Sequence, residues 1–92
     1  MTSMNNILKE IETAAIDKKG KDIVVLDVGT LSDITDYYFI ISAKNDRQVK
    51  AIRDEISIRL KENFKRTPKH VEGAPSSKWI VMDYFDFIIH IF

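Results

Sequence analysis

The chain has 92 residues, its 14 Lys and Arg balance 14 Asp and Glu, and 45% of its residues are hydrophobic. This length predicts a single domain, and the hydrophobic content is too high for a disordered chain. The lack of Cys excludes a disulfide framework and a thiolate metal site, and zero net charge argues against a general nucleic-acid binder. No apolar run approaches the ~20 residues of a membrane helix, and the N-terminus has no signal-peptide pattern, so we expect a cytoplasmic protein.

The first half of the chain predicts a helix followed by two strands. Apolar residues recur at helical spacing within 7–15, and Gly20 ends this segment after two lysines. The run 23–28 is β-branched and almost wholly apolar, which predicts a buried strand. We expect a loop at 29–36 and a second strand at 37–43.

The second half predicts a long helix and then two or three strands. Asn45 is a suitable N-cap, and Gln48 follows it at the spacing of a capping box. The helix that they begin carries an apolar stripe at helical spacing: Val49, Ile52, Ile56, Leu60 and Phe64. A short edge strand is expected at 69–72, and further strands at 78–83 and 86–92. This order predicts an α/β or α+β fold, in which two long helices layer a mixed β-sheet.

The last two strands predict a β-hairpin whose two faces differ in character. With Tyr84 and Phe85 as the central turn residues, Val81 pairs with Ile88, and side chains alternate between the faces. One face is wholly apolar and consists of Ile80, Met82, Phe87, Ile89 and Ile91. The other face is mixed and consists of Trp79, Val81, Asp83, Asp86, Ile88, His90 and Phe92. We expect the helices to cover the apolar face, and the mixed face to be either open or covered by something else.

The mixed face has the composition of a protein-binding surface. Its Trp79 lies among aliphatic side chains beside an acidic end, and Trp is the residue most enriched in interface hot spots. The alternative is that Trp79 caps a thin core.

Short motifs then follow one another in register along most of the chain. They are residues 35–41, 47–52, 72–73, 79–84 and 86–92. In this order and spacing, from about Ile7 to the last residue, they resemble the Iojap-like family of ribosomal silencing factors. Each motif alone is a weak signal, but together they are specific.

The resemblance implies a fold, an activity and a partner. The implied fold is a single domain over 1–92 with a nucleotidyltransferase-like core that lacks that enzymatic activity and needs no cofactor. The implied partner is ribosomal protein fourteen of the large ribosomal subunit, where the bulk of the bound factor blocks the small subunit and represses translation, notably under nutrient limitation. The family usually continues into a C-terminal helix, and because this sequence stops at Phe92 we expect that helix to be missing, either by truncation or because this member has lost it.

The resemblance also maps an interface onto the final hairpin. Trp79, Val81, Asp83 and Tyr84 match the interface residues of the family, and the mixed face adds two more. The predicted docking residues are therefore Trp79, Val81, Asp83, Tyr84, Asp86 and Ile88. Another alternative is that this face forms a homodimer with a second copy of the chain.

Phe85 departs from the family pattern, which usually has Gly at this position. Gly suits a turn that needs positive φ, whereas Phe is strained there. The turn type is therefore left open, and Phe85 could extend the apolar patch.

The chief alternative function is a nucleotide- or metal-dependent enzyme on the same core. Carboxylates for a Mg²⁺ site would come from Asp27, Asp33, Asp36, Asp83 and Asp86. However, the segment 43–46 before the second helix has no Gly and places an acid where a phosphate would sit. With only His70 and His90 as histidines and no Cys, we expect neither catalysis nor a metal site.

A small basic cluster surrounds the end of the second helix. Its members are Lys61, Lys65, Arg66 and Lys69. Cations at a helix C-terminus complement the helix dipole, so a solvated helix end explains the cluster. The alternative is a minor contact to ribosomal RNA beside the docking site.

Overall fold

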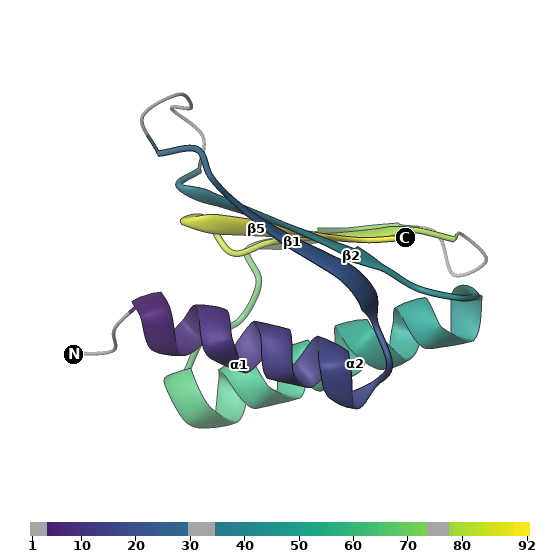
Figure 1. Ribbon diagram of the computed structural model, residues 1–92. Coiled ribbons are helices and arrows are strands. Elements are labelled where there is room, and N and C mark those ends of the chain that lie inside the picture. The colour runs from purple at the N-terminus through teal and green to yellow at the C-terminus, as the bar shows by residue number, and fades with distance from the viewer. Residues whose placement is uncertain (1–3, 30–34, 74–77) are drawn as a thin grey trace.

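The computed structural model describes residues 4–29, 35–73 and 78–92. Figure 1 shows two layers, a β-sheet and two helices that both lie on one face of it. The elements are α1 (Met4–Asp17), β1 (Lys21–Asp27), β2 (Tyr37–Ser42), α2 (Asp46–Phe64), β3 (His70–Glu72), β4 (Ile80–Asp83) and β5 (Phe87–Ile91). The strand order is β1-β2-β5-β4-β3, with β2 and β5 parallel and the other pairs antiparallel. The predicted mixed sheet layered by two helices is confirmed.

The helices pack through the apolar stripes that the sequence predicts. The buried residues of α1 are Ile7, Ile11, Ala14 and Ala15, and those of α2 are Val49, Ile52, Ile56 and Leu60. The side chain of Asn45 accepts a 2.9 Å hydrogen bond from the Gln48 backbone N–H, which confirms the predicted N-cap. The Gln48 amide in turn donates to the carbonyls of Lys18 and Lys19 at 3.0 and 2.9 Å. Gln48 therefore ties the end of α1 to the start of α2. Neither helix in the described part of the chain is long and apolar enough to cross a membrane.

The prediction that strand 23–28 is buried is wrong. β1 is an edge strand, and Val24, Val25 and Leu26 are 42%, 40% and 43% exposed. Because an edge strand has one neighbour, helices and strands cover it less than a central strand of the same sequence. Of the loop predicted at 29–36, residues 30–34 lie outside the described residues; in the part described, the Val28 N–H donates to the Asp36 carbonyl at 2.9 Å.

The C-terminal hairpin forms, but the predicted register is wrong by two residues. Val81 pairs with His90 instead of Ile88. The turn moves by one residue, to Phe85 and Asp86, because the Tyr84 N–H donates to the Phe87 carbonyl at 2.9 Å; Phe85 has φ of 81°. Since side chains alternate with a period of two, this shift leaves each strand residue on its predicted face. The apolar face is buried under the helices as predicted: Ile80, Met82, Phe87, Ile89 and Ile91.

Candidate docking surface

Both helices lie on one side of the five-stranded sheet, and the opposite sheet face runs over all five strands (Figure 1). Residues directly opposite in neighbouring strands share a face, so the pairing registers define transverse rows. One row consists of Leu26, Tyr38, Ile88, Asp83 and His70. The next row consists of Val24, Ile40, His90, Val81 and Glu72. We call these two rows, together with Trp79 just before β4, the outer face.

The two halves of the outer face differ in chemistry. Over β1, β2 and β5 it is mainly apolar, and the rings of Tyr38 and His90 lie 5.6 Å apart. Over β3 and β4 it is polar and acidic, with His70 Nε2 at 3.0 Å from Glu72 Oε1 and Asp83 opposite His70. An apolar patch with a polar rim is the usual composition of a protein interface.

Three predicted docking residues belong to this outer face, Trp79 just before β4 and Val81 and Asp83 within it. Trp79 is 47% exposed, and Val81 and Asp83 are half-buried. The Asp83 carboxylate accepts a 2.8 Å hydrogen bond from the Phe85 N–H. Ile88 lies on the same face at its centre but is only 8% exposed, because neighbouring side chains surround it. A partner would therefore meet Trp79 first and reach little of Ile88.

Tyr84 lies on the other side of the hairpin, within the core. Its side chain is 2% exposed, and its ring stacks on Phe87 with centroids 4.9 Å apart. Burial raises the pKa of the Tyr84 phenol to about 12. Tyr84 therefore supports the hairpin from beneath and offers a partner almost no surface.

Asp86 is also engaged within the chain. Its carboxylate forms an ion pair with Arg66, which follows the end of α2. The same guanidinium donates to the Tyr84 carbonyl at 3.1 Å and lies 5.4 Å from the centroid of the Phe87 ring. Arg66 therefore anchors the β4–β5 turn to the helical layer, and Asp86 faces that layer. The two-residue change of register moves Asp86 from a strand, where it was expected, into the turn.

The sequence prediction missed the part of the outer face that lies outside the hairpin. Tyr38 and Ile40 of β2 belong to it because β2 pairs directly with β5. The alternation along 37–42 shows that β2 has two faces, but only the strand order reveals which face continues that of Trp79. That order depends on a parallel pairing between distant segments, for which the local sequence holds no signal.

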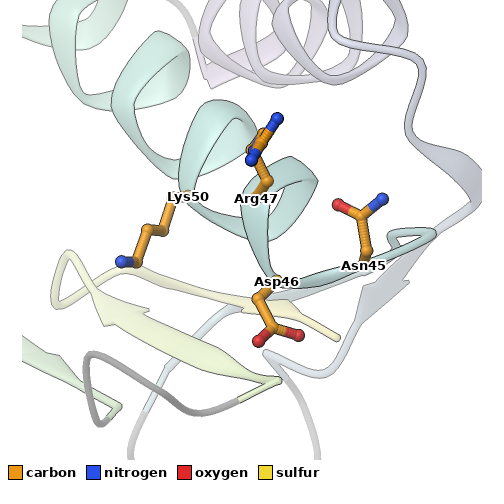
Figure 2. Close-up of a pocket in the computed structure, with 4 residues that line it drawn as sticks. All are labelled: Asn45, Asp46, Arg47 and Lys50. Atoms are coloured by element: carbon orange, nitrogen blue, oxygen red, sulfur yellow. The ribbon is translucent and has the colours of Figure 1, made fainter.

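An open depression of about 560 Å³ at the start of α2 is the place where an enzyme of this core would hold phosphates. It is lined by Asn45, Asp46, Arg47 and Lys50. Figure 2 shows that these four side chains, from the N-cap Asn45 and the start of α2, spread in different directions. The Asn45 side chain is occupied with capping Gln48, and the Asp46 carboxylate would repel an anion at the helix N-terminus. Among the described residues, the lining therefore lacks the convergent polar groups of a nucleotide site.

Acidic and histidine side chains do not gather into a metal site anywhere in the described ranges 4–29, 35–73 and 78–92. On β3, His70 Nε2 lies 3.0 Å from Glu72 Oε1, but this pair supplies only two ligand side chains. Asp33, which the enzyme alternative would use, lies outside the described residues.

Comparison with known proteins gives concordant results. The family model described as "Ribosomal silencing factor during starvation" matches residues 1–92. The Bacillus subtilis protein named ribosomal silencing factor RsfS is 34% identical over 98% of this chain and 75% of its own length. The protein of that name from Haemophilus influenzae is 38% identical over 79% of this chain and 71% of its own length.

Solved structures show the same likeness in the fold. A crystal structure of a protein from Chromobacterium violaceum superposes with a TM-score of 0.89 and 30% identity, covering 98% of this chain and 74% of that one. A crystal structure from Bacillus halodurans has a TM-score of 0.83 and 26% identity, covering 96% of this chain and 81% of that one.

Proposed function

Because this chain belongs to the family of ribosomal silencing factors, we propose that it binds the large ribosomal subunit through ribosomal protein fourteen and prevents the small subunit from joining. Translation regulation through the ribosome is the function of the family. The specific partner, the docking residues and the steric mechanism are the proposal. The site of action is then the cytoplasm, where ribosomal subunits meet.

The observation that supports this function best is that, within residues 4–29, 35–73 and 78–92, neither helix covers the outer face of the sheet. Both helices pack on the opposite face, while the outer face presents Trp79 at 47% exposure beside the half-buried Val81 and Asp83. A Trp that is half covered by its own fold is held in place and still offers a large apolar area to a partner.

Each residue then has a distinct role in docking. Trp79 is the anchor, and Val81 with the rim of Ile88 forms its apolar surround. Asp83 pairs with a cation of the partner, which favours the encounter and fixes orientation more than it adds affinity. Tyr84 and Asp86 act from beneath, since the first packs on Phe87 and the second pairs with Arg66.

The size of the domain supports a steric mechanism. The chain measures 33 × 27 × 23 Å along its principal axes. Hydrogen bonds and van der Waals contacts between subunits form only within roughly 4 Å. Even the thinnest dimension of the factor, placed at the joining surface, keeps the facing groups far beyond that range. No catalytic step is needed, so we propose a non-enzymatic repressor.

A direct test is co-sedimentation followed by a subunit-joining assay. The protein is mixed with isolated large subunits, small subunits or both, and the fractions of a sucrose gradient are probed for the protein and for joined ribosomes. We expect it in the large-subunit fraction only, with fewer joined ribosomes as its concentration rises. Absence from the large-subunit fraction would refute the proposal. Cross-linking to ribosomal protein fourteen on the bound subunit then tests the partner.

The alternatives have tests of their own. Saturable micromolar binding of a Mg²⁺-nucleotide in calorimetry would favour the enzyme. Concentration-dependent sedimentation of the free protein would reveal a homodimer, which would compete for the same face. If the cluster of Lys61, Lys65 and Lys69 touches ribosomal RNA, its neutralisation weakens binding most at low salt.

A further inference from the structure

The β4–β5 turn holds Phe85 in a conformation that Phe rarely adopts. Its φ is 81°, and the Asp86 N–H donates to the Tyr84 carbonyl at 3.1 Å, which closes a tight turn around it. A turn of this kind with positive φ at its centre is uncommon and strained for any residue with a Cβ.

The rest of the fold enforces this conformation from several directions. Tyr84 N–H donates to the Phe87 carbonyl at 2.9 Å, and Phe85 N–H donates to Asp83 Oδ1 at 2.8 Å. Arg66 holds the Tyr84 carbonyl from the helical side at 3.1 Å. Strain of this sort persists only where the surroundings over-determine it, and it gathers at sites of function.

The phenyl ring contributes little to the folded core in return. Phe85 is 69% exposed, more than any other large hydrophobic side chain in the described residues. The Nζ of Lys69 lies 5.6 Å from the centroid of its ring. This cation–π contact restricts the ring, so less side-chain freedom remains to be lost when a partner covers it.

Phe85 extends the docking strip of β4 at the end opposite Trp79. It follows the outer-face residues Val81 and Asp83 at the same spacing of two, and its N–H bonds the Asp83 carboxylate. Lys69 is joined to the same strand end, since its N–H donates to the Asp83 carbonyl at 2.7 Å. The ring therefore lies beside the acidic end of the proposed interface.

We propose that Phe85 is a second anchor of the docking surface, whose ring inserts into an apolar hollow of the ribosomal protein that receives Trp79. The inference rests on the proposed function and adds a contact to it. In this arrangement the chain holds a strained turn because the exposed ring serves binding and not folding.

The test measures the affinity for isolated large subunits and the melting temperature of each variant. Phe85→Gly relieves the positive φ and removes the ring, and Phe85→Asn removes the ring at a residue that tolerates this φ. We expect both to bind roughly tenfold more weakly, the loss typical of one interface anchor. The melting temperature of Phe85→Gly should equal or exceed that of the wild type, and Phe85→Tyr should bind like the wild type.

Lys19→Gly is the matched control, because Lys19 also has a positive φ, of 65°. Lys19 follows α1 and contacts Gln48 at the start of α2, whereas the β4–β5 turn contacts Arg66 just after the end of α2. It should be as stable as Phe85→Gly and bind like the wild type. If Trp79→Ala weakens binding while Phe85→Gly and Phe85→Asn do not, the second anchor is refuted and the proposed function stands. If the wild type does not bind large subunits at all, both are refuted. A melting temperature that falls in both ring-deleted variants would show that the ring supports the fold, and would overturn the inference.

Discussion

Truncation of Trp79 separates a docking role from a packing role, because the ring is divided almost equally between solvent and the protein. A Trp side chain presents roughly 250 Å² of surface, so 47% exposure leaves about 120 Å² for a partner to bury. At ~25 cal/mol per Å² this area is worth about 3 kcal/mol. We therefore expect Trp79→Ala to weaken binding to large subunits by about 2–3 kcal/mol, or roughly 30- to 150-fold.

The effect on folding should be smaller. The covered half of the ring is at the surface, so water fills the space after truncation and no closed cavity remains. Area sums for folding are also upper bounds, since a denatured chain already covers part of its apolar surface. We expect the free energy of unfolding to fall by about 1 kcal/mol, which lowers the melting temperature of a domain of this size by roughly 4–8 °C.

The assay is a titration of labelled protein with large subunits at a temperature where every variant is folded. Ile58→Ala is the matched control, because Ile58 is a similarly exposed apolar residue, at 52%, on α2 in the helical layer. It should bind like the wild type. Binding of Trp79→Ala within threefold of the wild type, or an equal loss in the Ile58 variant, would refute the reasoning.

Three further predictions concern residues that stabilise the fold beneath the outer face. Asn45→Ala should lower the free energy of unfolding in urea by about 1 kcal/mol, the usual value of an N-cap, while Asn45→Ser should retain most of it. Arg66→Gln should lower it by about 1–2 kcal/mol, because Asp86 loses its half-buried ion partner and the Tyr84 carbonyl loses a donor. Burial raises the pKa of Tyr84 from 10.0 to about 12, so the folded state keeps a proton that the unfolded chain releases above pH 10. The contribution of Tyr84 to the free energy of unfolding should therefore be fully present below pH 10 and fall by up to about 3 kcal/mol toward pH 12. Unfolding measurements on Tyr84→Phe should lack this contribution to the pH dependence.

The features of the fold that depend on neighbours in sequence could be predicted. The start of α2 is one: an Asn with the right residue three positions later, followed by an apolar stripe, specifies the helix locally, and the cap forms as expected. The two faces of the hairpin are another, because the alternation of side chains is a local property of an extended chain.

Features of the fold that depend on segments distant in sequence could not be predicted. The burial of β1 was mispredicted because an apolar run has the same appearance in a central strand and in an edge strand. Tyr38 and Ile40 reach the outer face only through the parallel pairing of β2 with β5. That pairing joins segments separated by the whole of α2.

The two-residue error in the hairpin register shows how far a face pattern can specify an interface. A pattern of period two cannot distinguish registers that differ by two residues, so the faces of β4 and β5 are right in either. The turn is different, because the shift draws Asp86 out of the strand and toward Arg66, while Tyr84 packs on Phe87. It also leaves Phe85 at the tip with φ of 81° and an exposed ring. The alternation pattern therefore fails to predict the positions of the turn residues. At that turn the chain keeps a strained, exposed Phe85 beside the outer face to which Trp79 belongs.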